Sequence, residues 1–424
     1  MRRPYARTVQ AAAVAAATAL AAAGCALTGS SQGIGTAQLF GATGKPITVG
    51  ISLPLTGDFQ ADGVASARGY QLWADNVNAS GGLLGRPVKL VIRNDKSDPG
   101  TTAKDYTALI TQDHVDLTMA PFSSLLTVAA APVAAKHHYA MTAGSAGAPA
   151  VYALKPKTLF STTVPIADEM VPFAHWVLSL PAGRRPATAA YGTVDDPFAA
   201  PPVQTVQKVL EQGGVRTVYS HAPYTKTSPS ALRADADQMA KANAQILVLG
   251  AVDVPTVATF MSEFQKQHYN PQLFIASSGP DQGQAFLNAV GPANATGVLV
   301  PNGWSGNFPA ALSHVMVQNY IAKYGGTAAG VNADVAEAYS AGEVMAAAVT
   351  GTDSLGQGKI ISYLRRHTVQ TAVGPAQFGP YGQNERGETF LFQWQPGASF
   401  VQVLPVAAPG SVPILGAKPQ WSGG

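Results

Sequence analysis

From Ile47 onward, segments in which apolar residues have the spacing of a β-strand alternate with segments in which they have the spacing of an α-helix. Short runs such as Val88, Leu90 and Ile92, in which apolar and polar residues alternate, predict strands. Longer runs such as 62–78, which place apolar residues on one helical face, predict helices. Strand-like runs occupy residues 47–55, 88–92, 115–119, 188–191, 216–219, 245–249 and 273–276. Two successive series of this kind predict an α/β protein with two doubly wound parallel-sheet domains.

The last part of the chain changes character. Between residues 374 and 405 the pattern is again that of strands, with Phe390, Phe392 and Trp394 in alternation. Beyond Pro405 the sequence is rich in Pro and Gly, so we expect residues 406–424 to be a loose tail.

The first 24 residues have the composition of a leader. Two arginines, Arg2 and Arg3, precede an Ala-rich apolar stretch, and small residues follow it up to Cys25. This order predicts a secretory signal peptide over residues 1–24, because the apolar stretch is too short and too weakly hydrophobic for a membrane span.

Cys25 stands directly after the predicted signal peptide. The segment LAAAGC resembles a bacterial lipobox, although the usual Leu three positions before the Cys is replaced by Ala22. The resemblance implies lipidation of Cys25, and two acyl chains give a stable membrane anchor. The small, polar residues 25–44 would then form a flexible tether. An ordinary cleaved signal peptide with an unmodified thiol is the alternative.

Composition and charge exclude several classes of function. The chain has 27 Lys and Arg against 24 Asp and Glu, and three of the arginines lie in the leader, so the remainder is neutral and nucleic-acid binding is not expected. The single Cys excludes an intrachain disulfide and a multi-Cys metal site. His137 and His138 lie beside no other ligand at metal spacing, and no hydrolase motif occurs. We therefore expect a protein without cofactor or metal that is not an enzyme.

Five stretches of sequence carry a resemblance to a known family. They are ITVGISLPLTGDFQADG (47–63), NASGGLLGRPVKLVIRNDKSDP (78–99), APFSSLLTVAAAPVAAKHHYAMTAGSA (120–146), VGPAQFGPYGQN (373–384) and FLFQWQPGASFVQVLP (390–405). In this order they resemble the type I periplasmic solute-binding proteins of branched-chain amino acid and amide ABC transporters, the group of the leucine/isoleucine/valine-binding protein.

The resemblance implies a fold and a domain plan. Two α/β lobes are joined by three hinge crossovers, and a ligand is held between the lobes. The expected plan is lobe one at 45–162 and 297–372, lobe two at 163–296 and 373–405, and crossovers near Thr162, Val298 and Val373.

The resemblance also implies ligand-binding residues on the loops that face the gap between the lobes. Ser123 and Ser124 begin an Ala-rich helix, where hydroxyls and free N–H groups can receive a carboxylate or amide, although plain helix caps are the alternative. The other expected positions are Phe59, Gly144, Ser145, Ala146, Phe198 and Trp304, for which core, loop or interlobe packing is the alternative.

Two departures from the family pattern bear on the ligand. The carboxylate that holds the α-ammonium group in amino-acid binders is replaced here by Ser278. Asp281 can substitute if the loop shifts, but as written it is expected to cap a helix. The aromatic residue expected after strand 245–249 is also missing, with Val252 near its place. The ligand is therefore not expected to be a standard aliphatic α-amino acid, and amides, urea-like compounds, aromatic acids and other small polar metabolites remain open.

The sequence thus predicts an extracytoplasmic, membrane-anchored lipoprotein that captures a small polar ligand and delivers it to an ABC importer. The expected partners are the ligand and the ABC permease in the membrane, with the protein itself a monomer that binds no nucleic acid. A ligand-sensing domain that signals to a membrane or regulatory partner is the alternative.

Overall fold

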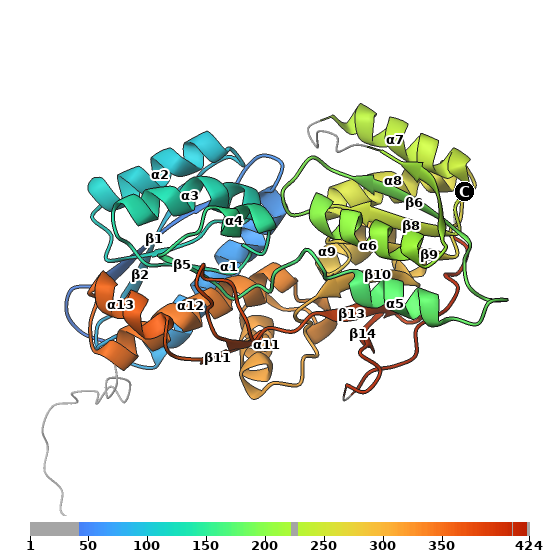
Figure 1. Cartoon of the computed structure of the whole chain (residues 1–424). Helices are drawn as coiled ribbons and strands as arrows, with labels where there is room; N and C mark the ends of the chain where they lie inside the picture. Colours follow the sequence, from blue (N-terminus) through green and yellow to red (C-terminus); the bar gives the residue numbers. More distant parts are fainter. Residues whose placement is uncertain (1–41, 222–227, 409, 422–424) are drawn as a thin grey trace, which may run out of the picture. The chain divides into compact units, whose positions relative to one another are not determined.

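The computed structural model describes residues 42–221, 228–408 and 410–421, all of which belong to one compact unit. The predicted signal peptide, Cys25 and all but the last residues of the predicted tether lie outside the described residues. Two separate sheets organise the described part of the chain, each flanked by helices (Figure 1). Each sheet with its helices is called a lobe below.

Lobe one is built on a five-stranded parallel sheet of order β2-β1-β3-β4-β5. Its strands are β1 (Ile47–Leu53), β2 (Val88–Asn94), β3 (Leu117–Met119), β4 (Met141–Ala143) and β5 (Leu159–Ser161). Its helices are α1 (Gln60–Ala79), α2 (Pro99–Thr111), α3 (Ser124–Lys136), α4 (Pro149–Ala153), α11 (Ala311–Tyr324), α12 (Ala333–Thr352) and α13 (Gln357–Leu364), with the short turn η1 (Ala328–Gly330) between α11 and α12. Helices α2, α3 and α4 cover one face, and α1, α12 and α13 cover the other (Figure 1).

Lobe two is built on a seven-stranded sheet of order β14-β13-β10-β9-β8-β6-β7. Its strands are β6 (Thr188–Thr193), β7 (Arg216–Ser220), β8 (Ile246–Gly250), β9 (Leu273–Ala276), β10 (Val298–Asn302), β13 (Phe390–Gln395) and β14 (Ser399–Leu404). Its helices are α5 (Val171–Ser179), α6 (Ala200–Gln212), α7 (Pro229–Ala242), α8 (Val254–Lys266), α9 (Gln284–Val290) and α10 (Pro292–Ala295). Strands β6, β7, β8, β9 and β10 pair in parallel. Strands β13 and β14 add an antiparallel edge to the sheet.

Side chains of β8 show why both faces of the lobe-two sheet are covered. Leu247 and Leu249 point into the core beneath α7 and α8, whereas Ile246 and Val248 point into the core beneath α5 and α6. A strand that is apolar on both sides requires helices on both sides. The prediction of two doubly wound α/β lobes is thereby confirmed.

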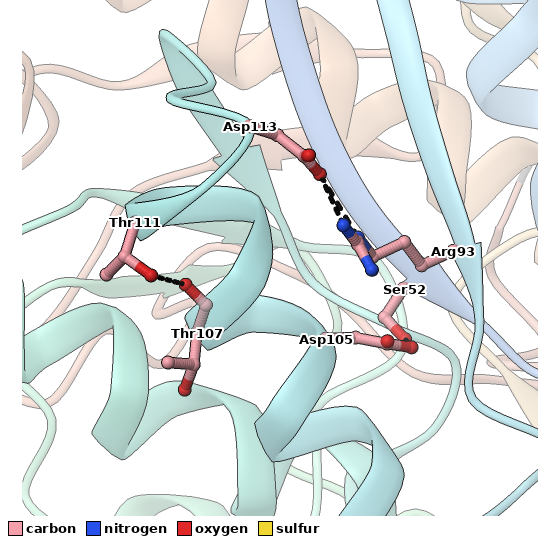
Figure 2. A network of polar contacts seen from close by, with 6 residues as sticks. All are labelled: Ser52, Arg93, Asp105, Thr107, Thr111 and Asp113. Carbon is pink, nitrogen blue, oxygen red and sulfur yellow. Dashed lines mark hydrogen bonds and ion pairs between the residues drawn. The ribbon is translucent and has the colours of Figure 1, made fainter.

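Polar contacts tie the neighbouring strands β1 and β2 of lobe one to α2 and to the loop beyond it (Figure 2). The Arg93 guanidinium of β2 donates to the Asp113 carboxylate beyond the end of α2 over 2.8 Å. The Ser52 hydroxyl of β1 lies 2.8 Å from a carboxylate oxygen of Asp105. Each of these carboxylates has a donor, so the network stabilises the lobe without leaving a binding group free.

The crossovers lie a few residues from their expected positions. The first leaves β5 at Ser161, next to Thr162. The second follows Asn302 rather than lying near Val298, because Val298 begins β10, which pairs with β9 and β13 in the lobe-two sheet. The third lies between Phe378, which packs in the core of lobe one, and Phe390, which packs in that of lobe two.

Residues 369–376 explain the shift of the third crossover. They form the hairpin of β11 (Val369–Thr371) and β12 (Gly374–Ala376), and Ala376 is buried in lobe one. Further along, Asn384 donates its side-chain amide to the Thr162 carbonyl over 2.9 Å. The first and third crossovers are thus bound to each other, as neighbouring hinge strands are.

The segment after β14 packs against lobe two in place of the expected loose tail. Trp421 is 7% exposed, stacks on Phe264 and donates from its indole nitrogen to the Asn294 carbonyl over 3.0 Å. Lys418 donates to the Asn270 side chain and lies over the Trp421 ring. One large aromatic anchor outweighs the Pro- and Gly-rich composition of the segment.

Candidate functional site

A cavity lies between the two lobes, at the carboxyl ends of their strands. Residues 123–124, 145 and 162–163 reach it from the ends of β3, β4 and β5, and residues 252, 277–278 and 302 reach it from the ends of β8, β9 and β10. The volume that the centre of a water molecule can occupy in this cavity is about 70 Å³. The cavity therefore has room for a small solute. Ligands of open α/β sheets bind at this edge.

Seven of the ten residues that the sequence singled out for ligand binding line this interlobe cavity. They are Ser123, Ser124, Ser145, Phe198, Ser278, Asp281 and Trp304. The structure therefore brings together loops that are separated by up to about 180 positions in the sequence, as expected for a site built on strand ends.

The other three lie behind the cavity wall. Phe59 packs edge-to-face on Phe122, at 5.8 Å between ring centroids, and it is Phe122 that lines the cavity. Ala146 is fully buried in the lobe-one core. At Gly144 a Cβ would lie 2.6 Å from the carbonyl carbon of Glu337, so the missing side chain lets this loop approach α12.

The two serines at the start of α3 do not act as side-chain caps of that helix. Ser123 is the N-cap residue, but its hydroxyl makes no capping hydrogen bond and has no partner, although the side chain is buried. The Ser124 hydroxyl accepts from the Ala148 backbone N–H over 3.3 Å. The Ser123 hydroxyl is therefore left available to a molecule in the cavity.

Asp281 is held as a cavity residue and not as the helix cap expected from its loop. One carboxylate oxygen accepts from the Ser278 hydroxyl at 3.1 Å and the Gly279 N–H at 2.9 Å, and the other accepts from the Asn302 side chain at 2.6 Å. Helix α9 begins three residues beyond, at Gln284, with Gly283 at its N-cap. A carboxylate thus stands beside Ser278, where the family pattern had seemed to lose one.

Helix α12 brings two further carboxylates from lobe one. Asn332 caps the helix by accepting from the Asp334 N–H over 2.8 Å, which directs the first turn at the cavity. Asp334 and, three residues later, Glu337 share one face of the helix and both line the cavity. One oxygen of Glu337 accepts from the Ser145 hydroxyl at 2.7 Å, and one oxygen of Asp334 has no partner.

Glu169 adds a carboxylate from the first crossover. It lies just before α5, is 5% exposed, lines the cavity and has one carboxylate oxygen without a partner. The buried hydroxyl of Thr163, on the same crossover, also lacks a partner. Unpartnered buried polar atoms that face a cavity are the pattern of a binding site rather than of a core.

Burial is the main cause of the raised pKa values of these carboxyl groups. It raises the pKa of Glu337 to about 8 despite the hydrogen bond from Ser145. Burial, and then the neighbouring carboxylates, raise the pKa of Glu169 and that of Asp334 well above their usual range. Burial also raises the pKa of Asp281, against the hydrogen bonds that favour its charged form. Without a cation nearby, Glu169, Asp334 and Glu337 therefore hold protons at neutral pH.

Aromatic and apolar residues form the rest of the wall. Trp304 is 1% exposed, and its indole nitrogen donates to the Ser313 hydroxyl over 2.8 Å, so only the ring is offered to the cavity. Phe198 is half-buried, and Val252 stands where the family has an aromatic residue. The cavity thus combines an apolar wall with charged groups at defined points.

A buried hydrogen bond joins the lobes beside the cavity. The Gln282 side chain, between β9 and α9, donates to the Asp62 carboxylate of α1 over 2.6 Å. Both residues are at most 2% exposed. This contact between elements of different lobes holds them together over the cavity.

Sequence reasoning missed Glu169, Asn302, Asp334 and Glu337. For Asp334 and Glu337 the sequence offered one signal, since they stand three residues apart near the start of a helix that follows an Asn cap. Glu169 and Asn302 carried none, because neither a crossover turn nor a strand end reveals from sequence which way its side chain points.

Two negative findings apply to the described residues. Across them, no three His, Cys, Asp or Glu side chains are grouped so that they could hold a metal ion. No helix in the same part of the chain has the length and apolar character of a membrane span.

Comparisons with known proteins agree with the fold. A profile of the periplasmic binding protein family matches residues 46–399. An amino acid binding protein of Pseudomonas aeruginosa is 22% identical over 369 residues, which cover 84% of this chain and 92% of that protein.

Solved structures share the fold at low sequence identity. The branched-chain amino acid transporter substrate-binding protein LivJ of Streptococcus pneumoniae, in complex with isoleucine, has a TM-score of 0.72 at 19% identity, over 84% of this chain and 100% of that one. A solute-binding protein of an ABC transporter from R. palustris, in complex with benzoate, has a TM-score of 0.72 at 16% identity, over 85% and 96% of the two chains. The chain belongs to the periplasmic binding protein family, with the fold of its type I members, and is a solute-binding protein rather than an enzyme.

Proposed function

We propose that this protein is an extracytoplasmic lipoprotein that captures a small polar ligand between its lobes and delivers it to an ABC importer. The observation that carries the proposal is the interlobe cavity, which strand ends of both lobes line with buried, unpartnered polar atoms. A site shared by two lobes is completed only when the lobes close, so ligand binding and closure favour each other.

The proposed ligand contacts come from both lobes. Lobe one offers Ser123, Ser124, Ser145, Asp334, Glu337 and Trp304, and the crossovers and lobe two offer Glu169, Phe198, Ser278, Asp281 and Asn302. Phe59, Gly144 and Ala146 act behind them by holding Phe122, α12 and the loop after β4 in place. The hydrogen bond between Asp62 and Gln282 belongs to the closed arrangement.

The cellular role is supported by the family and by the leader. The family works outside the cytoplasm, and the similar LivJ and R. palustris proteins are described as parts of transporters. The leader and the lipobox-like segment before Cys25 would deliver the protein across the membrane and hold it there by acyl chains. The closed, ligand-loaded protein, as a monomer, would be the form that the permease recognises.

Thermal unfolding of the full-length protein in detergent, with a panel of amino acids, amides, urea and aromatic acids, tests ligand capture. A ligand at about 100 times its Kd should stabilise the folded state by roughly 2.7 kcal/mol. Deletion of the protein should abolish uptake of the same compound, whereas a sensor would leave uptake intact and alter a regulatory response. Mass spectrometry of the protein from membranes should find acyl chains on Cys25, and Cys25→Ser should release the protein.

A further inference from the structure

The interlobe cavity is strongly acidic. Five of the described residues that line it are Asp or Glu, and none is Lys, Arg or His. Three of the five, Glu169, Asp281 and Asp334, are buried, Glu337 is half-buried, and Glu388 is exposed. Carboxylates are rarely buried unless a partner compensates their charge, so this concentration requires an explanation.

Hydrogen bonds within the protein satisfy only part of this cluster. Asp281 has three donors, but Glu169 and Asp334 each keep an oxygen without a partner, and both residues are more than nine-tenths buried. Loss of hydration without a new partner costs free energy, and a cationic molecule in the cavity would supply that partner.

The arrangement favours an organic cation over a metal ion. Among the described residues no three potential ligand side chains converge closely enough to bind a metal. The carboxylates instead approach the cavity from separate elements: the first crossover, the β9–α9 loop and α12. An ammonium group has three N–H donors and a guanidinium group has five, so either can reach acceptors that are spread around a cavity.

We propose that the cavity selects a small organic solute of net positive charge, whose ammonium or guanidinium groups are held by Glu169, Asp281, Asp334 and Glu337. This inference rests on the proposed function and names the class of solute that is captured. The acids come from both lobes, so a cation between them links the lobes and favours closure. An anionic ligand such as benzoate would find no cationic side chain among the described residues that line the cavity.

Isothermal titration of the full-length protein at pH 7 provides the test, with putrescine and L-arginine as cations, L-leucine as a zwitterion, benzoate as an anion and calcium chloride as a metal control. We expect putrescine or L-arginine to bind at least 100-fold more tightly than the other three. The carboxyls that hold protons in the empty protein must ionise, so binding should also release protons, measured as an enthalpy that depends on the buffer.

Variants on α12 and on the first crossover test which carboxylates hold the cation. Glu337→Gln and Glu169→Gln should each weaken cation binding by at least 10-fold, because the amide cannot ionise yet keeps the shape of the protonated acid. Glu343→Gln is the matched control: this carboxylate is on the same helix and its pKa is raised to about 7, but it accepts from the Ala372 N–H and does not line the cavity. It should leave the Kd unchanged.

The outcomes separate this inference from the proposed function. Tight binding of leucine or benzoate, with no response to either cation, overturns the inference and leaves solute capture in place. Tight binding of calcium overturns the choice of an organic cation. If none of the five compounds binds, the cationic class is contradicted, and the wider panel of the thermal unfolding assay decides the capture of small solutes separately. Binding of a cation that Glu337→Gln and Glu343→Gln weaken equally contradicts the assigned contacts.

Discussion

Two groups of carboxylates in this protein differ in how fully their oxygens are hydrogen-bonded. In the lobe-one network, Asp113 pairs with Arg93 and Asp105 lies 2.8 Å from the Ser52 hydroxyl (Figure 2). In the interlobe cavity, Glu169 and Asp334 keep oxygens without any donor although they are more deeply buried. The deeper group is thus the less satisfied one.

The difference teaches where to look for function. A network that must only stabilise a lobe pairs its acids with neighbouring donors, since that lowers the free energy of the folded state. A site that must bind a solute leaves acceptors free, and the rest of the fold has to supply the stability lost there. Burial with incomplete pairing, rather than acidity alone, marks the interlobe cavity as the working surface.

The largest expected effect comes from Asp281→Asn in the cavity, set against Asp113→Asn in the network. Removing one partner of a buried charge pair costs about 2–5 kcal/mol, so Asp281→Asn should weaken binding of a cationic solute by about 100-fold. Asp113 lies outside the cavity, so Asp113→Asn should leave the Kd unchanged. Titration calorimetry measures the Kd of the cationic solute for both variants. Equal Kd values would contradict the distinction between the cavity carboxylates and the network carboxylates.

The pH dependence of stability should differ between wild type and Glu337→Gln. In the empty protein burial raises the pKa of Glu337 from 4.5 to about 8, so between these values the folded state holds a proton that the unfolded state has lost. Stability should therefore fall as pH rises from 6 to 8, by at most about 1.4 kcal/mol per pH unit for this group.

Glu337 is faced by other acids, which include Asp281 and Asp334, and by the Ser145 hydroxyl, so the comparison with its own Gln variant isolates its share. Urea unfolding of the empty proteins should give a flatter pH profile for Glu337→Gln. Parallel profiles would show that this carboxyl titrates as an ordinary exposed acid.

Ser52→Ala should destabilise lobe one without touching ligand binding. The buried Ser52 hydroxyl lies 2.8 Å from Asp105 and 3.2 Å from Asp95, and its loss leaves acceptors short of a donor at about 1–3 kcal/mol. Thr111→Ala is the control from the same network, because its exposed hydroxyl donates only to the Thr107 carbonyl (Figure 2). Denaturant unfolding should rank the two variants in this order, and a reversed ranking would refute the account of the network.

The smallest effect is expected for Arg93→Ala. The side chains of Arg93 and Asp113 are 34% and 32% exposed, so solvent screens their attraction and the loss should lie between about 0.2 and 1 kcal/mol. The loss should shrink further in 1 M salt, measured by the same unfolding experiment. An effect above 2 kcal/mol would mean that the pair is shielded from solvent.

The sequence by itself determined the two-lobed α/β fold and much of the cavity wall. Alternating strand and helix periods show which runs are strands and which are the helices that cover them, and residues after a parallel strand gather at one edge of its sheet. Ser123, Ser145 and Ser278 could therefore be placed at the cavity from sequence, because each closely follows a strand end.

Only the tertiary structure decided the limits of the lobes and the fate of the tail. Strand β10 looks alike in either sheet, and its pairing with β9 and β13 assigns it to lobe two. The tail is held by the burial of Trp421 against Phe264, a contact between residues 157 positions apart. Local composition does not encode such partners.

The tertiary structure also determined which charged side chains surround the cavity. Ser278 in place of an acid suggested from sequence that the site had lost its carboxylate, whereas the fold directs Asp281, Asp334, Glu169 and Glu337 into the same cavity. Side-chain direction on a turn or helix face depends on what packs behind it, as Gly144 does behind Glu337. The sequence therefore determined where a ligand would be held, and the packing of distant elements determined which charges surround it.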